Sequence, residues 1–548
     1  MSKQAADRSV SADGVMRELG ELRRFHLRSY LMIALVFFSA ALYGTNYVFL
    51  AADVNYRCVV PECEARNSTQ FSQPWTAHAL PGAGREARCS RRAPAAPAPA
   101  PADCRDPAAF SDALLACDSW LYADNNTIVA EFGLACQEWK RTLVGTIHNF
   151  GMLVSLPILG YVSDNFGRKR ALVLSCTLVG VIGSLKAFSI SYEMYVIVEF
   201  LETVAGASAF PAAYILIVEL IGEKKRVLAT AFISTMLVVG GISFALLAKT
   251  FPYWRTFILV VYPPSILFVL YTYFLPESIR WLLSKGRKDE AVEIIMGAAK
   301  LNNVTLSDET MKQLTAEKPQ TNKDDVVPQG IWIQVFKSPI IRMRLLICSW
   351  WWITCTFVFY GLAINSVSLA GDKYTNYMLV VSVELIAVAL NILLLDRIGR
   401  KRTLLMAFTI CGLACISITF VPKDLPWLVT LLYLLGKVTI TQAFGGIYMY
   451  TSELFPTSAR HSLLASCSML GRLGSIVAPQ MPLLAIYVDW LPSVLFGSTA
   501  LVAGALMLLT PETLHTRLPD TIADAEALAT RAPPPAAASD AARETSRC

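Results

Sequence analysis

Twelve stretches of about twenty apolar residues dominate the sequence and constrain its fold more than any other feature. A bilayer core is about 30 Å thick and a helix rises about 1.5 Å per residue, so roughly 20 apolar residues cross it. The stretches lie near 30–51, 142–163, 171–189, 193–221, 227–249, 254–275, 343–365, 374–395, 403–421, 426–452, 461–487 and 491–510. They predict an all-α membrane protein with 12 transmembrane helices.

The composition excludes several other classes of protein. Of the 548 residues, 54% are hydrophobic and 16% are charged, against roughly 25% charged residues in a soluble domain. So apolar a chain needs lipid to cover its surface, which argues against a soluble enzyme. The net charge of +6 is too dispersed to indicate a nucleic-acid partner. A Gly-rich phosphate loop, a nucleophile elbow and an HExxH motif are absent from the sequence, so we expect no enzyme, no cofactor and no metal site.

Basic residues in the short loops predict the topology. The loops after even-numbered spans hold eleven Lys and Arg residues, and the short loops on the other face hold four. By the positive-inside rule, the N-terminus (1–29) and the tail (512–548) of this multi-pass membrane protein are cytoplasmic. The loop 52–141 is then extracellular, and 276–342 is a cytoplasmic linker with short helices. We expect the tail from about Ala523 to be disordered.

The loop between spans one and two is rich in cysteine. It holds or adjoins six cysteines: Cys58, Cys63, Cys89, Cys104, Cys117 and Cys136. An even count in an oxidising compartment predicts up to three disulfides and leaves 15 pairings open. Asn67 and Asn125 begin glycosylation sequons on the same face. Residues 91–102, rich in Ala and Pro, indicate a flexible insert.

Three motifs occur twice in the chain. The first follows spans two and eight, as DNFGRKR at 164–170 and DRIGRKR at 396–402. The second follows spans four and ten, as ELIGEKKR at 219–226 and ELFPTSAR at 453–460. The third follows spans six and twelve, as PES at 276–278 and PET at 511–513. Their offsets of 232, 234 and 235 residues are nearly equal. The chain therefore reads as two six-helix repeats in one orientation, with spans at 30–275 and 343–511.

The repeated motifs suit a junction that moves. The residues concerned are Asp164, Gly167, Arg168, Glu219, Arg226, Asp396, Gly399, Arg400, Glu453 and Arg460. The glycines permit a tight loop, and arginines form forked pairs with carboxylates. The aspartates end their helices, where a negative charge needs a compensating group. A neighbouring arginine or the N-terminus of a helix from the other half would provide it. We expect these residues to control the conformational cycle.

In its repeated D-x-x-G-R-[KR]-[KR] loops and its PES and PET motifs, the chain resembles the major facilitator superfamily. With its six-cysteine loop and the motifs at 213–222, 276–282 and 450–456, it also resembles the organic cation, carnitine and anion transporters of the solute carrier 22 family. The resemblance implies the major facilitator fold, a central cavity that opens alternately to either side, and a small organic ion as the substrate. It leaves open whether Na⁺, H⁺ or no ion is coupled to transport.

Ionisable residues inside spans are costly and usually face a cavity. The clear cases are Glu199, Glu202, Glu384, Lys437 and Arg472. We expect substrate contacts from Arg472, Glu384 and Lys437, and from Tyr214 and Tyr360, which lie deep in their spans. By the resemblance, Glu384 matches a position often held by a carboxylate, and carnitine-type and anion-type members carry arginine near Arg472. A guanidinium and a carboxylate together would suit a zwitterion. The alternative for Glu384 is a fixed ion pair with Arg472 or Lys437.

Other polar and aromatic residues in the spans receive structural interpretations. Lys186 lies near a helix end, and we expect it to extend toward the interface. His148 is alone in span two, so we expect it to be packed or hydrogen-bonded. Trp350 to Trp352 read as an interfacial aromatic belt. By the resemblance, Glu199 stands where related members usually have arginine, and Thr203 where they have glycine.

These observations predict a transporter of organic cations or carnitine-like zwitterions that works by alternating access in the lipid bilayer. An organic anion transporter is the near alternative because Arg472 is cationic. A sugar porter and a non-transporting receptor on the same fold fit less well.

Overall fold

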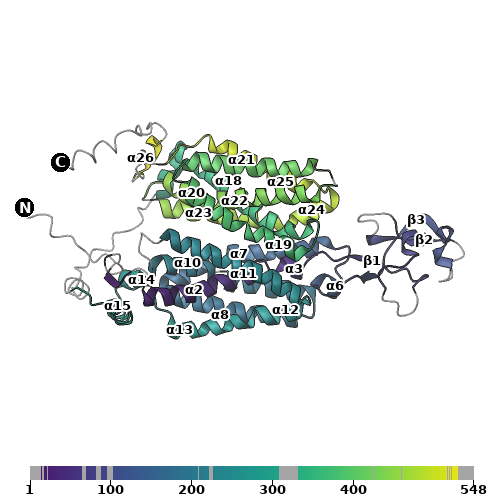
Figure 1. Ribbon diagram of the computed structural model, residues 1–548, viewed down its shortest axis with the longest axis horizontal. Coiled ribbons are helices and arrows are strands. Elements are labelled where there is room, and N and C mark those ends of the chain that lie inside the picture. Colours follow the sequence, from purple (N-terminus) through teal and green to yellow (C-terminus); the bar gives the residue numbers. More distant parts are fainter. Residues whose placement is uncertain are drawn as a thin grey trace, which may run out of the picture. The chain divides into compact units, whose positions relative to one another are not determined.

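The fold is seen in a computed structural model (Figure 1). It describes residues 14, 18–20, 23–64, 70–81, 88–95, 103–207, 209–220, 226–307, 331–422, 424–457, 459–514, 516, 519 and 521–528. The predicted glycosylation site at Asn67 lies outside these residues, whereas Asn125 is exposed.

The first half of the chain contributes spans one to six. They consist of α2 (Arg24–Tyr43) with α3 (Tyr47–Leu50), α7 (Glu138–Phe166), α8 (Arg168–Leu185) with the 3₁₀ turn η3 (Lys186–Phe188), α9 (Tyr192–Gly206) with α10 (Ala209–Leu220), α11 (Arg226–Thr250), and α12 (Trp254–Val261) with η5 (Pro263–Leu270) and α13 (Tyr271–Phe274). Two prolines start η5, and since proline lacks an N–H, the α-helical bonding of span six is interrupted there.

The second half contributes spans seven to twelve. They consist of α18 (Pro339–Asn365) with η6 (Ser366–Ser368), α19 (Lys373–Ser382) with α20 (Glu384–Leu394), α21 (Arg400–Ser417) with η7 (Ile418–Phe420), α22 (Pro426–Leu454), α23 (Arg460–Val477) with η8 (Ala478–Gln480) and α24 (Met481–Tyr487), and α25 (Leu491–Met507).

The helices agree with the twelve predicted spans. Among the described residues, eleven helical stretches have at least 18 residues and are apolar enough to cross a membrane, and the shorter apolar helix α25 supplies the twelfth. The chain is thus an integral, multi-pass membrane protein. Its helices form two compact units, the first from Met1–Lys318, Tyr360–Leu385 and Ser475–Pro492, and the second from Pro319–Phe359, Ile386–Gly474 and Ser493–Cys548.

The loop after span one is an ordered subdomain. Its elements are β1 (Tyr56–Cys58), α4 (Thr76–Ala79), β2 (Ser90–Pro94), η1 (Asp103–Arg105), η2 (Pro107–Ala109), β3 (Phe110–Ala116), β4 (Trp120–Tyr122) and α6 (Ile128–Glu131). β1 pairs antiparallel with β4, and β2 with β3. The flexible insert expected from residue 91 is therefore wrong for its first four residues, because they belong to β2.

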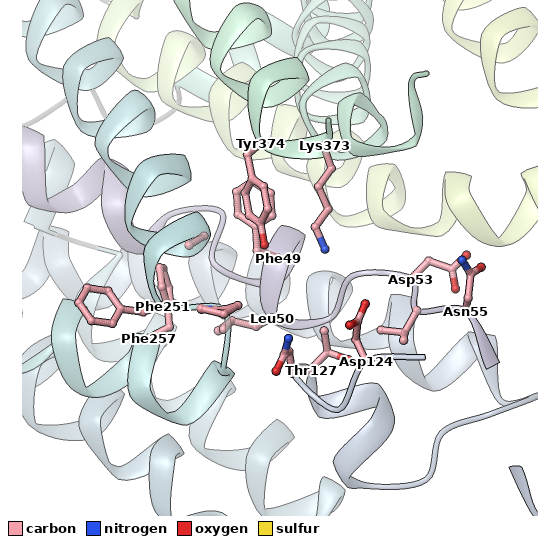
Figure 2. A pocket seen from close by; sticks show the side chains of 14 residues that line it. Phe49, Leu50, Asp53, Asn55, Asp124, Thr127, Phe251, Phe257, Lys373 and Tyr374 are labelled. Atoms are coloured by element: carbon pink, nitrogen blue, oxygen red, sulfur yellow. The ribbon is translucent and has the colours of Figure 1, made fainter. Parts of the chain in front are cut away.

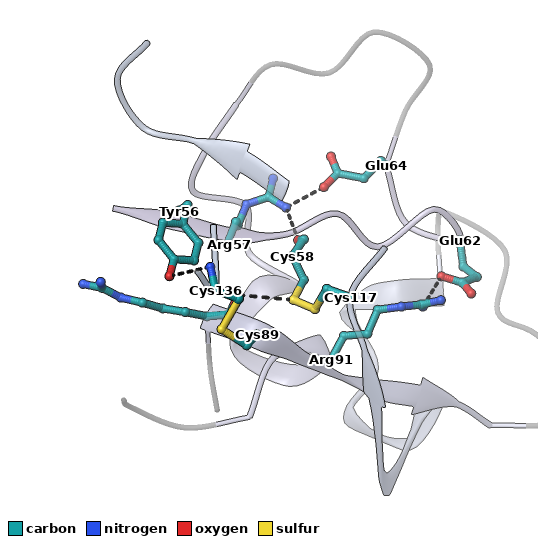
Figure 3. The surroundings of a disulfide bond; sticks show 10 residues. Tyr56, Arg57, Cys58, Glu62, Glu64, Cys89, Arg91, Cys117 and Cys136 are labelled. Atoms are coloured by element: carbon teal, nitrogen blue, oxygen red, sulfur yellow. Dashed lines mark hydrogen bonds and ion pairs between the residues drawn. A yellow bond between two sulfur atoms is a disulfide. The ribbon is translucent and has the colours of Figure 1, made fainter. Parts of the chain in front are cut away.

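Three disulfides fasten this subdomain, as the even number of cysteines predicts. They join Cys58 to Cys117, Cys63 to Cys104 and Cys89 to Cys136, with Cα–Cα distances of 5.6, 5.8 and 5.8 Å. Figure 3 shows two of them beside the ion pairs of Arg57 with Glu64 and of Arg91 with Glu62. The buried side chains of Val60, Trp75 and Phe110 pack around the Cys63–Cys104 bridge.

The two ends of the first unit differ (Figure 1). The loop subdomain lies at one end, which we call the loop end. The short helices α14 (Ile279–Ser284) and α15 (Lys288–Asn302) lie at the opposite end, which we call the linker end. There they enclose a second small core with Leu19 and Phe25, which holds the start of α2 against the linker.

In the second unit, the tail contains a helix that the sequence did not predict. This helix is α26 (Ile522–Ala527), which follows the last span. Another short helix of this unit, α17 (Ile331–Lys337), precedes α18. The Thr521 hydroxyl and the Asp524 carboxylate form a capping box that starts α26. Arg344, 2% exposed, donates to the Ala525 carbonyl, and Ser338 donates to Glu526. The expected disorder of the tail is wrong for these residues.

Candidate functional site

Lys437 is the most deeply buried of the five residues predicted to contact a substrate. It lies on α22 and is 0% exposed. Its ammonium lies 3.3 Å from the centroid of the Phe359 ring and donates a 3.3 Å hydrogen bond to the Phe359 carbonyl. Phe359 in turn packs against Phe444, about two turns along α22 from Lys437. The second unit therefore places a lysine ammonium against an aromatic face in its interior.

Arg472 lies on α23 where this helix packs closely against α18. A side chain at Gly474 would contact Thr356 and the backbone of α18, so only glycine permits this approach. The Thr356 hydroxyl donates across the contact to the Gly471 carbonyl. Arg472, between the two glycines, is half-buried. Its guanidinium offers five donors in a fork suited to a carboxylate.

The other three predicted contact residues belong to the first unit. Tyr360 is half-buried near the end of α18, and Tyr214 on α10 is 41% exposed. Glu384 is half-buried and begins α20, because span eight is interrupted between Ser382 and Glu384. A carboxylate at a helix N-terminus is electrostatically favourable. The suggested pairing of Glu384 with Arg472 or Lys437 stays a prediction.

The interfacial belt expected at Trp350 to Trp352 is wrong for two of the three residues. Trp351 and Trp352 are 0% and 1% exposed, whereas Trp350 is 36% exposed. The Trp351 indole N–H donates 3.0 Å to the Ala503 carbonyl, and the Trp352 N–H donates 3.3 Å to the Thr451 hydroxyl. These acceptors inside the second unit allow the indoles to be buried.

Three motifs of the first half meet in the first junction, which we define as Asp164, Gly167, Arg168, Glu219 and Glu277. Arg168 pairs with Asp164 one turn earlier, and its Nε lies 3.5 Å from Glu219 Oε1. Glu277 Oε1 accepts a 3.0 Å hydrogen bond from the backbone N–H that follows Arg168. This carboxylate thus lies at the N-terminus of α8, where the helix dipole favours a negative charge.

The second junction, defined as Asp396, Gly399, Arg400, Glu453 and Glu512, repeats this arrangement. Arg400 lies 3.0 Å from Asp396, and its Nε lies 3.5 Å from Glu453 Oε1. Glu512 Oε1 accepts a 2.9 Å hydrogen bond from the Arg400 backbone N–H at the start of α21. Each junction therefore gathers its three motifs within its own half.

Both junction glycines are required by their backbone conformation. Gly167 has φ +112° and Gly399 has φ +109°, and a side chain at either would meet the carboxylate of Glu277 or Glu512. Of the two partners expected for the aspartates, the arginine is the one observed. Arg460 donates 3.3 Å to the Phe455 carbonyl. Arg226 starts α11, and its side chain lies outside the described part of the chain.

A buried group of charged residues occupies the interior of the first unit, and we call it the charged cluster (His148, Lys186, Glu199 and Glu202). The Lys186 ammonium lies 2.8 Å from Glu199 Oε2 and 3.0 Å from Glu202 Oε2. His148 Nδ1 lies 2.7 Å from Glu199 Oε1. All four side chains are at most 2% exposed.

The charged cluster corrects two interpretations from the sequence. Lys186 does not extend toward an interface, since η3 turns its side chain inward to both glutamates and to the Tyr262 hydroxyl at 2.8 Å. A side chain at Gly183 would overlap the Tyr262 ring, so this glycine admits the tyrosine to the cluster. His148 is hydrogen-bonded, as expected, but it is not isolated. The missed signal was the i, i+3 spacing of Glu199 and Glu202, which places both on one face of α9.

Segments of both sequence halves meet at the loop end of the first unit in what we call the loop-end contact. Thr45 shares a 2.8 Å hydrogen bond with Tyr377 of α19, and Phe49 stacks on Tyr374 with ring centroids 5.1 Å apart. Lys249 and Asp372 form a 3.1 Å ion pair. The Gln480 amide, in η8, accepts from Thr142 at 3.0 Å and donates to Thr146 at 2.7 Å; both threonines are on α7.

A pocket adjoins the loop-end contact (Figure 2). Its lining combines aromatic rings with charged groups of both signs: Phe49, Phe251, Phe257, Tyr374, Asp53, Asp124 and Lys373. Figure 2 shows Lys373 and Tyr374 reaching into it from α19, with the two carboxylates on the facing loop. Such a lining matches the chemistry of a small organic ion.

Comparison with known proteins assigns this architecture to a class. Residues 118–479 match the Major Facilitator Superfamily. The structure of the proton:xylose symporter XylE bound to 6-bromo-6-deoxy-D-glucose superposes with a TM-score of 0.57 at 16% identity, over 92% of this chain and 100% of that one. The inward-open xylose transporter XylE from E. coli gives 0.55 at 18% identity, over 74% and 93%. The fold is therefore the twelve-helix major facilitator fold of membrane transporters, and the protein is not an enzyme.

Sequence relatives narrow the class to a family. The chain is 31% identical to mouse (Mus musculus) solute carrier family 22 member 3, over 94% of this chain and 96% of the relative. It is equally identical to the organic cation transporter protein of Drosophila melanogaster, over 94% of each, and to human (Homo sapiens) organic cation/carnitine transporter 2, over 93% of each. The chain belongs to the solute carrier 22 family of transporters.

Proposed function

We propose that the protein transports organic cations and carnitine-like zwitterions by alternating access, with a preference for substrates that bear a carboxylate. The observation that carries the preference is Lys437, completely buried with its ammonium against Phe359. A lysine ammonium in a membrane interior attracts an anionic group, so a substrate that bears a carboxylate is favoured over one that is only cationic.

Four more residues supply the remaining chemistry of the proposed site. The forked guanidinium of Arg472 suits the carboxylate of a substrate, and Glu384 suits its ammonium. Tyr360 and Tyr214 offer aromatic faces for a quaternary ammonium, worth about 2 kcal/mol when desolvated. The name of the related organic cation/carnitine transporter 2 supports the same class of substrate.

The two junctions supply the moving parts in this proposal. Asp164 and Asp396 are 66% and 74% exposed, while their arginine partners are 16% and 9% exposed. Pairs at the surface can break and re-form as the helices move, because exposed ion pairs are worth about 1 kcal/mol or less. We assign the linker end, the N-terminus and the tail to the cytoplasm of a plasma-membrane protein, on the distribution of basic loop residues.

Uptake into liposomes that contain the purified protein tests the proposal. Labelled tetraethylammonium, carnitine and a monocarboxylate without a cationic group are compared side by side in wild type and Arg472→Ala. We expect wild type to transport carnitine best. Arg472→Ala should weaken carnitine uptake by about tenfold or more, since about 1.4 kcal/mol is one decade, and should affect tetraethylammonium less.

The same experiment distinguishes the neighbouring functions. The two cationic residues Lys437 and Arg472 favour an organic anion transporter as the second candidate, and fastest uptake of the monocarboxylate would establish it. Equal loss of all three activities in correctly folded Arg472→Ala protein would make this arginine a structural element. Absence of any uptake by the folded wild type would favour a receptor.

A further inference from the structure

The charged cluster does not belong to the proposed substrate site and has an unusual charge balance. With both glutamates ionised, Lys186 protonated and His148 neutral, its net charge is −1. Addition of one proton makes it neutral. Because uncompensated charge in a buried site costs several kcal/mol, the cluster favours binding one proton.

A metal ion is the competing ligand for these side chains. One donor atom each of His148, Glu199 and Glu202 lies within 4.8 Å of the others, which fits metal-ligand spacing. The Lys186 ammonium, however, lies 2.8 and 3.0 Å from the same two carboxylates. This ammonium already occupies the position between the carboxylates that a metal ion would take, and it would repel such an ion. It forms no hydrogen bond with His148, so the histidine can still bind a proton.

The geometry of His148 points to the site of protonation. Glu199, when ionised, can only accept, so a neutral His148 donates its Nδ1–H to it at 2.7 Å. Nε2 then carries a lone pair, and this buried atom has no hydrogen-bond partner among the described residues. Asn46 Oδ1, whose amide donates 3.3 Å to Glu199, is also buried and without a described partner. Both acceptors need a hydrogen that a proton or its accompanying water would supply.

Every helix packed around the cluster contributes a group that influences this proton. α9 supplies Tyr195 in addition to the glutamates, α12 is followed by Tyr262, α2 supplies Tyr43, and α3 supplies Tyr47. The Asn46 amide donates to both Glu199 and the Tyr262 hydroxyl. Tyrosine and asparagine side chains are neutral, so among the described residues named here only the four members of the cluster contribute a charge.

The break in span one connects the cluster to the loop-end contact. Between α2 and α3 the helix tightens, since the Val48 and Phe49 amides bond to carbonyls three residues earlier. Three successive residues here face different partners. Thr45 bonds to Tyr377 in the loop-end contact, Asn46 bonds to Glu199, and the Tyr47 ring lies 5.2 Å from that of His148. A change at the cluster therefore reaches the loop-end contact through one short segment.

We propose that the cluster binds one exchangeable proton in each transport cycle, so that transport of the substrate is coupled to a proton. Protonation removes the negative charge that holds Asn46, and the break in span one transmits this change to the loop-end contact. The proton is shared by His148 and the two glutamates, and belongs to the group and not to one residue. This inference rests on the transport activity proposed above.

Proton coupling is measured in liposomes under an imposed gradient of one pH unit, applied in each direction, with no sodium present. At one proton per substrate, we expect about tenfold accumulation of carnitine in one of the two directions. Glu202→Gln should abolish this accumulation and retain exchange of labelled for unlabelled carnitine at equal pH, because the amide still accepts from Lys186. Glu193→Gln, an exposed residue on the same helix, is the matched control and should behave as wild type.

The outcomes separate the two proposals. Exchange without any response to pH in wild type overturns proton coupling and leaves the transport proposal intact. In a second series a sodium gradient replaces the pH gradient; accumulation in that series only also overturns proton coupling and favours a metal ion. If Glu202→Gln does not fold, His148→Gln replaces it with the same expectation.

Should exchange itself fail, infrared titration of the purified protein still decides the question. A band of the histidine ring or of a protonated carboxyl group that titrates between about pH 5 and pH 9 and is altered in His148→Gln or Glu202→Gln supports the bound proton. A cluster that does not titrate in this range rules it out.

Discussion

The two halves of this transporter are nearly identical at their junctions and different in their interiors. Arg168 and Arg400 each contact an aspartate four residues earlier, and each Nε lies 3.5 Å from a glutamate of the next motif. Among the described residues, the interior of the first half holds two glutamates, a lysine and a histidine, whereas the second holds the buried Lys437 and Arg344 and the half-buried Arg472 and Glu384. The junctions, which are alike in both halves, are consistent with a shared role in the movement of the helices. The interiors, which differ, are consistent with separate roles in proton coupling and in substrate choice.

The largest effect should come from the junction arginines. Arg168→Ala and Arg400→Ala each remove contacts to two carboxylates, and we expect each to lower turnover by about tenfold or more for every substrate. The exposed Arg170→Ala and Arg402→Ala are matched controls in the same motifs. A tenfold difference between the two arginine variants, or a change in substrate preference, would break the equivalence of the junctions.

The junction glycines should show the same symmetry at a smaller scale. Gly167→Ala and Gly399→Ala force a side chain into a positive-φ conformation, at a cost of about 1–3 kcal/mol each. We expect similar decreases in melting temperature for the two variants, measured in one detergent. If only one of the two variants lowers the melting temperature, the two junctions contribute differently to the stability of the folded protein.

Lys437 tests the difference between the interiors. Lys437→Met removes the charge and keeps most of the volume, and we expect about fivefold weaker uptake of carnitine, equivalent to about 1 kcal/mol. Uptake of tetraethylammonium should be unchanged or improved. Equal weakening of both, with normal surface delivery, would show that the lysine supports the fold only.

The smallest effect concerns Glu131 at the loop end of the first unit. It accepts 2.6 Å from the Trp254 indole and 2.9 Å from Arg255. Partial burial opposes its ionisation, but these hydrogen bonds dominate and hold the pKa of Glu131 below the ordinary value of 4.5. Its contribution to stability is complete above that value and is lost as the pH falls through the lower folded-state pKa.

Glu131→Gln should therefore lower the melting temperature slightly at pH 7, by the equivalent of about 1 kcal/mol or less. The difference from wild type should shrink in acid. A difference that stays constant down to about pH 3 would mean that the carboxylate charge has no role.

Hydropathy and the repeated motifs were sufficient to predict the twelve helices and their family, because span length and loop charge are local properties of the sequence. Side-chain partners across helices are not local. Lys186 lies near the end of span three, and only the packing of α8 against α9 and α12 shows that it meets two glutamates and not the interface. Trp351 and Trp352 were misassigned for the same reason, since their buried acceptors lie 99 and more residues away.

The comparison of carnitine with choline, which lacks the carboxylate, tests the central claim most directly. Wild-type protein in liposomes is supplied with each compound at equal concentration and equal membrane potential, and initial uptake rates are measured. The cationic groups of the second half predict that carnitine is taken up at least about tenfold faster. Equal rates, or faster uptake of choline, would contradict the assignment of Lys437 and Arg472 to a substrate carboxylate.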